Sequence, residues 1–282
     1  MIHALIDLGQ GSIAFSLGPL NIPWYGLGYV VGVSVLLWVS RSEAVRRGFE
    51  ARHVMDALVV VALFALIGGR LYHVIDQWAF YSQDLPAIVL PPYSGLGLYG
   101  GVAGAVLGIF VYTRRQRLPL WTALDIVVPG ALFAQGIARW GNFFNHELYG
   151  PPTDAPWGLA IDCQHRVAEY PCATFPAATT GFQPLFLYES ALDVTGGLAA
   201  LWLARRYPDR LRDGDLASLW AMWYGSVRFA LETFRYGYDW TLFGIPTAML
   251  IGAGLIVFGG VTILLRHQRP PVRSAGMTQP AT

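Results

Sequence analysis

The stretch Arg139–Gly150, RWGNFFNHELYG, gathers side chains that could bind a charged ligand and move protons. It contains a guanidinium, two carboxamides, an imidazole and a carboxylate. Arginine offers a planar fork of donors that suits phosphate, and asparagine can both donate to and accept from hydroxyls. A helix cap followed by a solvated turn is the alternative interpretation. So much polarity beside a long apolar run is more typical of a site. The side chains are those of Arg139, Asn142, Asn145, His146 and Glu147.

Other ionisable residues lie inside apolar stretches. Arg228 and Glu232 are four residues apart and would share one face of a helix, and Glu189 lies in the preceding apolar stretch. An unpaired arginine in a bilayer costs roughly 2.5–3.5 kcal/mol on insertion scales. A structural ion-pair network is one explanation, mainly for Glu189 and Glu232. For Arg139 and Arg228 we expect an anionic ligand, because arginines outnumber nearby carboxylates on the outward side. A phospholipid headgroup is the most available anion at this depth.

The elements that must position these residues are membrane helices. The chain is 54% hydrophobic and only 13% charged, whereas soluble proteins have about 25% charged residues. Several apolar runs approach the roughly 20 residues that cross a bilayer. We therefore predict an all-α polytopic integral membrane protein with about seven transmembrane helices. The expected spans are about 25–39, 54–74, 94–112, 121–137, 185–203, 216–234 and 243–265.

The arginines predict the orientation of these spans. All 19 basic residues are arginine, and 14 of them lie in alternate connections or in the C-terminal tail. The positive-inside rule makes that side cytoplasmic, so the N-terminus is expected outside and the C-terminus inside. A small excursion at about 151–182 would then be extracytoplasmic, where Cys163 and Cys172 either pair or remain free thiols. The other five arginines are Arg70, Arg139, Arg166, Arg228 and Arg235; all except Arg166 lie near the outward ends of spans and call for an anionic partner.

Several classes of chemistry lack their sequence signatures. We expect no metal site, because the sequence has no Asp-rich cluster and no histidine pair at helical spacing. No nucleotide-binding loop, dinucleotide fingerprint or nucleophile elbow is visible. No nucleic-acid partner is expected either, because the arginines follow the predicted topology.

The motif RWGNFFNHELYG resembles the signature of the bacterial prolipoprotein diacylglyceryl transferases, Arg-x-Gly-Asn-Phe-x-Asn-x-Glu-x-x-Gly. The likeness extends over almost the whole chain, because further segments match the family in order. These are WYG at Trp24–Gly26, GGR at Gly68–Arg70, Asp125, LYE at Leu187–Glu189 and YGSVRFALETFR at Tyr224–Arg235.

The resemblance implies an enzyme of the bacterial inner membrane whose active site faces the outer side. Such enzymes transfer the diacylglyceryl group of phosphatidylglycerol to the lipobox cysteine of a prolipoprotein signal peptide, and they need no metal or organic cofactor. We expect a single transmembrane catalytic domain over residues 1–269. The tail at 270–282 contains Pro, Ser and Thr and is expected to be disordered and cytoplasmic. Arg139 and Arg228 would neutralise the departing phosphate. The implied substrate-binding residues are Arg139, Asn142, Asn145, Gly150, Tyr25, Arg70, Glu189, Tyr224, Glu232 and Arg235.

The chain departs from the family pattern at one position. Many members carry histidine in the glycine-rich third span, as a favoured general base, where this chain has Tyr99. An ordinary tyrosine titrates near pKa 10, far from neutrality, whereas histidine titrates near 6.5. Tyr99 therefore either positions substrate while His146 or Glu147 accepts the proton, or the homologue is inactive. The rival function is a transporter or lipid-binding protein that uses the arginines as an anion site, although no internal repeat is visible.

Overall fold

The chain is mostly helical. The structure is a computed structural model that describes residues 12–18, 20–89, 95–236 and 241–268. The disordered tail predicted for 270–282 lies outside this part of the chain. The helices are α1 (Trp24–Arg46), α2 (Arg52–Asp76), α3 (Trp78–Tyr81), η1 (Leu85–Ile88), α4 (Leu98–Arg115), α5 (Leu120–Phe144), α6 (Leu185–Arg206), α7 (Asp215–Glu232) and α8 (Thr247–Gln268). The short strands are β1 (Ile13–Leu17), β2 (Leu20–Pro23), β3 (Pro152–Thr153), β4 (Leu159–Ala160), β5 (Gly181–Phe182), β6 (Thr241–Leu242) and β7 (Ile245–Pro246).

The long helices coincide with the stretches expected to span a membrane. Among the described residues, α1, α2, α4, α5, α6, α7 and α8 each contain at least 18 residues. By length and composition, α2, α5 and α8 are apolar enough to cross a bilayer. The protein therefore has several candidate spans, while their total number and their direction stay predictions. The strands occupy the connections, so the all-α description applies only to the helical body.

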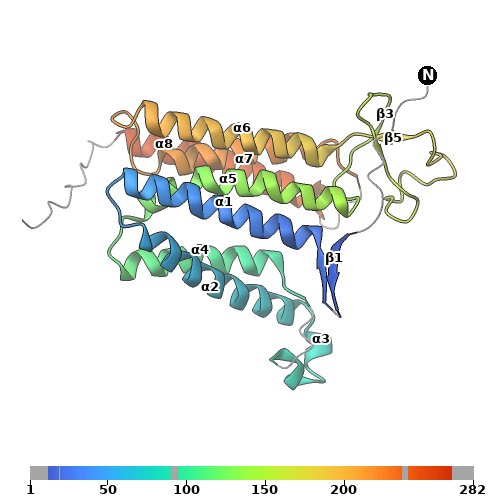
Figure 1. Ribbon diagram of the computed structural model, residues 1–282, viewed down its shortest axis with the longest axis horizontal. Coiled ribbons are helices and arrows are strands. Elements are labelled where there is room, and N and C mark those ends of the chain that lie inside the picture. Colours follow the sequence, from blue (N-terminus) through green and yellow to red (C-terminus); the bar gives the residue numbers. More distant parts are fainter. Residues whose placement is uncertain (1–11, 19, 90–94, 237–240, 269–282) are drawn as a thin grey trace, which may run out of the picture. The chain divides into compact units, whose positions relative to one another are not determined.

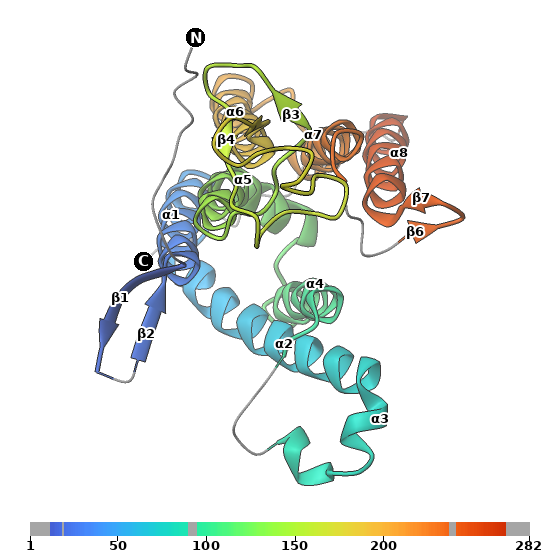
Figure 2. The ribbon, with the colours of Figure 1, turned by 90° about the vertical axis from the view of Figure 1, so that its right-hand side faces the viewer.

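The chain groups into two compact units, whose boundaries fall inside α1 and inside α5. The first unit contains Met1–Leu36 and Val128–Thr282, and the second contains Leu37–Val127. In the first unit α6, α7 and α8 lie side by side with the end of α5, and Figure 2 views these helices nearly end-on. Glycine allows α7 and α8 to pack closely, because a Cβ on Gly225 would lie 2.5 Å from the carbonyl oxygen of Gly252.

The insertion between α5 and α6 is a small, closed structure at one end of these helices (Figure 1). Its three strands form an antiparallel sheet in the order β3-β5-β4, in which Phe182 is opposite both Pro152 and Leu159. Phe182 is completely buried in a cluster that includes Tyr149 and Phe186. A disulfide joins Cys163 to Cys172, which decides between the two states that the sequence left open.

The second unit is built on the antiparallel pair α2 and α4. A Cβ on Gly104 would lie 2.1 Å from the carbonyl oxygen of Phe64, and one on Gly68 would lie 2.3 Å from that of Gly100. The glycine-rich third span is thus a helix-packing surface, as its composition indicated. The stretch from Asp76 to Tyr93, expected to be a loop or re-entrant piece, contains α3 and η1, and its last four residues lie outside the described chain.

Candidate active site

Three arginines and two glutamates form a chain of ion pairs in the first unit. Arg139 of α5 donates to Glu189 of α6 over 2.6 Å between Nη2 and Oε1. Arg228 of α7 bridges the two glutamates, with Nη1 3.3 Å from Glu189 Oε2 and Nη2 2.6 Å from Glu232 Oε2. Arg235, just after α7, lies 3.6 Å from Glu232. We call these five residues the arginine network.

The network contains the ion pairs that the sequence offered as one explanation, and its three arginines still outnumber its two glutamates. Packing of α5, α6 and α7 brings Glu189 and Glu232 beside the arginines as their ion-pair partners. The sequence could pair Arg228 with Glu232 through their helical spacing. It could not show that Glu189, on another helix, contacts both Arg139 and Arg228, because only tertiary packing decides that.

Burial within the arginine network is asymmetric. The side chains of Glu189 and Glu232 are 1% and 3% exposed, whereas those of Arg139 and Arg228 are 22% and 13% exposed. The carboxylates therefore lie behind the guanidinium groups. Within the described chain, Nη2 is the only donor of Arg139 with a hydrogen-bond partner. The arrangement fixes both arginines and leaves donors of Arg139 free to bind an anion, while both terminal nitrogens of Arg228 contact glutamates.

A carboxyl group that sequence reasoning did not select lies beside this network. Asp193 is one turn beyond Glu189 on α6, is fully buried, and interacts electrostatically with Glu189, Arg139 and Arg228. Neither of its carboxyl oxygens has a hydrogen-bond partner within the described residues. Tyr224 also faces the same charged groups, and its ring stacks on Trp220. The only sequence signal for Asp193 is its four-residue spacing from Glu189.

The rest of the motif forms a second polar cluster at the end of α5. Asn142 and Asn145 donate through Nδ2 to the two oxygens of Glu147, over 3.2 and 2.9 Å. The turn that brings Glu147 back to α5 has positive φ values at His146 and Leu148, where left-handed backbone is costly without glycine. Asn142 Oδ1 is buried and has no hydrogen-bond partner among the described residues.

Tyr25 connects the two clusters. It interacts electrostatically with both Glu147 and Arg139. The ring of Tyr25 lies against α5 at Gly141, because a Cβ on Gly141 would come within 2.4 Å of that ring. Gly141 therefore makes room for Tyr25, whereas Gly150 packs against Leu185 and donates its N–H to Gln183. The substrate-binding roles of Tyr25 and Gly150 stay predictions.

Two other selected residues belong to the second unit. Arg70 donates to the carbonyl oxygens of Ile88 and Ala87 over 3.0 and 2.7 Å, and its guanidinium lies over the ring of Tyr81. These contacts of Arg70 are with residues of its own unit, and its role toward substrate stays a prediction. Tyr99 lies in the first turn of α4, but its side chain is outside the described part of the structure.

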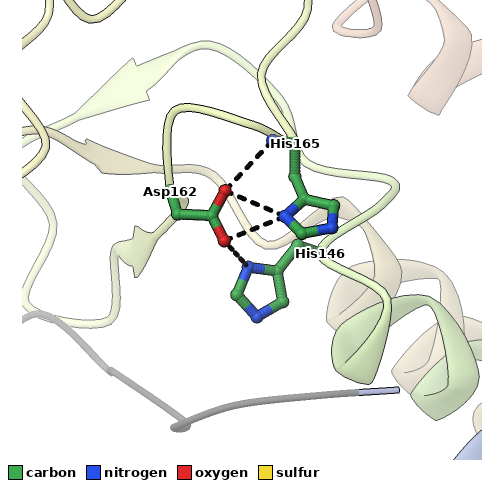
Figure 3. Close-up of side chains that lie close together, drawn as sticks. All are labelled: His146, Asp162 and His165. Carbon is green, nitrogen blue, oxygen red and sulfur yellow. Dashed lines mark hydrogen bonds and ion pairs between the residues drawn. The ribbon is translucent and has the colours of Figure 1, made fainter.

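His146 points toward the insertion. Its Nδ1 lies 3.4 Å from Asp162 Oδ2, and its ring centroid is 5.0 Å from that of His165 (Figure 3). Burial alone would raise the pKa of Asp162, but hydrogen bonds from His165 and from the amide of Gln164 outweigh it and hold that pKa below its ordinary value. Burial likewise raises the pKa of Tyr170 in the insertion to about 12. The described contacts of His146 are therefore with Asp162 and His165, not with the arginine network.

Comparison with known proteins decides the family. The model of the prolipoprotein diacylglyceryl transferase family matches residues 12–265. The chain belongs to this family. It is 38% identical over 266 residues to a phosphatidylglycerol–prolipoprotein diacylglyceryl transferase of Chloroflexus aggregans, which covers 89% of this chain and 87% of that protein. It is 34% identical to the Enterococcus faecalis protein of the same name, over 93% of this chain and 92% of that protein. Diacylglyceryl transferase 2 of Streptomyces coelicolor is also 34% identical, over 94% of this chain and 82% of that protein.

Proposed function

We propose that this transferase moves the diacylglyceryl group of phosphatidylglycerol to the lipobox cysteine of a prolipoprotein, with the lipid phosphate bound at the arginine network. Family membership supports the reaction. The partly exposed guanidinium of Arg139, with Arg228 held beside it through Glu189, supports the site. Asp193 is included in the proposal as a protonated carboxyl, because a buried carboxylate without hydrogen-bond partners is costly. The network then has one more positive than negative charge, which an anionic phosphate diester would balance.

The reaction requires a leaving group to be stabilised and a thiol to lose its proton. The cysteine sulfur forms a bond to the glyceryl carbon while the bond from that carbon to the phosphate oxygen breaks. The electron pair stays on the phosphate oxygen, and glycerol phosphate leaves. Donors that are fixed before the reaction lower the barrier most where this charge develops, which is the role we assign to Arg139 and Arg228. Arg235 extends the same surface.

The polar cluster at the end of α5 would hold the polar end of the lipid. Asn142, Asn145 and Glu147 can exchange hydrogen bonds with the hydroxyls of the glycerol headgroup. Glu147 is exposed and accepts hydrogen bonds from the side-chain amides of both asparagines. Tyr25 interacts electrostatically with both Glu147 and Arg139. We propose Glu147 as the proton acceptor for the thiol, because His146 is engaged with the insertion.

A transfer assay tests the proposal. Purified protein is incubated with labelled phosphatidylglycerol and a lipobox peptide, and the mass of the peptide is measured. We expect the peptide to gain a diacylglyceryl group. Arg139→Gln should lower this transfer by roughly 10²–10³-fold, the usual cost of one donor at a developing charge. Arg41→Gln, an exposed arginine in the second unit, is the matched control and should transfer at the normal rate.

Two results would contradict the proposal. Near-normal transfer by Arg139→Gln would show that the lipid phosphate does not bind at the arginine network. Lipid binding or lipid movement without any peptide mass gain would favour the rival transporter or lipid-binding function.

A further inference from the structure

We propose that His146, Asp162 and His165 form a binding site for a divalent transition-metal cation, best suited to Zn²⁺, which ties the Arg139–Gly150 motif to the insertion. His146 comes from the motif, directly after α5. Asp162 and His165 come from the insertion, between β4 and β5. Figure 3 shows both imidazole rings turned toward the one carboxylate. The sequence analysis predicted no metal site, because it found no histidine pair at helical spacing and no Asp-rich cluster, and His146 is far from Asp162 and His165 in the sequence.

The distances are close to those of a metal's coordination sphere. Zinc binds imidazole nitrogen and carboxylate oxygen at about 2.0–2.2 Å, so neighbouring ligand atoms in a tetrahedral site are roughly 3.3–3.5 Å apart. Asp162 Oδ2 lies 3.4 Å from His146 Nδ1 and 2.9 Å from His165 Nδ1. One ligand atom from each residue fits within a span of 4.8 Å. A cation bound by all three would need His165 Nδ1 to move away from Asp162 Oδ2.

Hydrogen bonding does not account for the position of His146. The carboxylate of Asp162 already accepts from the amides of Gln164 and His165 and contacts His165 Nδ1. His146 Nδ1 is buried and has no hydrogen-bond partner among the described residues, although the carboxylate of Asp162 is close. A cation would satisfy this nitrogen and balance the charge of Asp162. Two imidazoles and one carboxylate favour zinc or a neighbouring transition metal over calcium or magnesium, which prefer sites made of oxygen alone.

The surroundings suit a site that a cation can enter and that keeps its shape. The side chains of Asp162 and His165 are half exposed, which leaves an entry path, while His146 is 21% exposed. The Cys163–Cys172 disulfide directly follows Asp162 and restricts its loop. The disulfide also removes both thiols as competing ligands. The bound cation would fix the insertion against the turn that carries Asn145 and Glu147, independently of which reaction the motif performs.

Zinc titration of the whole purified protein tests this inference. The protein is held in detergent without reductant, with any polyhistidine tag removed, and Zn²⁺ is titrated in competition with a fluorescent chelator. We expect one zinc per chain. Loss of a residue that hydrogen-bonds a metal ligand typically weakens metal binding by roughly 10–100-fold. Loss of one of the three ligands themselves should weaken zinc binding by at least as much. The test variants are His146→Ala, His165→Ala and Asp162→Asn.

A matched control separates this site from any histidine beside a carboxylate. His267 forms a similar pair with Asp215, 3.0 Å apart, without a second histidine in the group. His267→Ala should leave the zinc affinity unchanged. Co²⁺ gives a second readout, because four-coordinate cobalt absorbs visible light strongly, and each test variant should lose that band. Zinc affinity that is equal in the wild type and in all three test variants, or no binding at all, would overturn the inference.

Discussion

At the scale of residues, two buried carboxyls on one helix are expected to behave differently. Glu189 holds Arg139 and Arg228, whereas Asp193, one turn further along α6, has no hydrogen-bond partner in the described chain. Glu189→Gln should lower transfer on the order of 10²-fold, because the guanidinium groups lose the charge that positions them. Asp193→Asn preserves the shape of a protonated carboxyl and should stay within about threefold of normal, since mutations without lost contacts have small effects.

The measurements for this pair are transfer rate, KM for phosphatidylglycerol and thermal stability. If Glu189 only holds the helices together, Glu189→Gln will unfold at a lower temperature while its folded fraction transfers normally. If Asp193→Asn loses as much activity as Glu189→Gln, then Asp193 acts as a charged group and the assigned charge balance is wrong.

The identity of the proton acceptor is the second question at this scale. Glu147→Gln removes the acceptor and should lower turnover by roughly 10²–10⁴-fold, the usual size of a general-base effect. His146→Ala should reduce it much less, because the described contacts of His146 are with the insertion. Raising the pH should partly rescue Glu147→Gln, since more of the substrate cysteine is then already thiolate. If His146→Ala lowers turnover more than Glu147→Gln does, then His146 is the proton acceptor.

The sequence could identify the arginines of this site but not the residues that contact them. It pointed to Arg139 and Arg228, because a charge in an apolar stretch needs a reason to be there. It could not reveal that Glu189 joins them or that Asp162 and His165 meet His146. Those contacts depend on how helices and an insertion pack, and residues far apart in sequence carry no spacing signal for them.

At the scale of elements, the α2–α4 pair depends on backbone contact at specific glycines. Gly104→Ala would place a methyl group 2.1 Å from the carbonyl oxygen of Phe64, and backbone cannot move aside as a side chain can. We expect a loss of about 1–3 kcal/mol of stability, the typical cost of overpacking. Gly101→Ala on the same helix meets only Ala65 O at 3.7 Å and should be neutral or slightly stabilising, because alanine favours helix.

Thermal unfolding in detergent measures this difference, and equal melting temperatures for the two variants would show that α2 and α4 pack differently. The existence of these helices was predictable, because their apolar runs are long. Their ends were less so: α5 continues to Phe144, beyond the expected end at 137, and thereby makes Arg139 and Asn142 helical neighbours. The polar residues that mark the motif also made its first residues look like the end of an apolar helix, so their helical conformation was not predicted.

At the scale of the whole molecule, the direction of the chain through the membrane is the main prediction left to test. The 14 arginines in alternate connections and the tail place the insertion on the outer side. The Cys163–Cys172 disulfide supports this assignment, because such bonds persist in oxidising compartments.

These are the only two cysteines in the chain, so a membrane-impermeant thiol reagent reports the location of the insertion directly. In cells whose outer layers have been removed but whose inner membrane is intact, we expect labelling only after a reductant has opened the disulfide. A second sample, in which Cys163 and Cys172 are replaced by serine and Ser274 by cysteine, tests the other face, because the tail should be labelled only after the membrane is opened. Labelling of the insertion that requires opening the membrane would reverse the orientation. A translocated lipobox cysteine lies on the outer side of the membrane. The reversed orientation would put the arginine network on the opposite side, where that cysteine could not reach it.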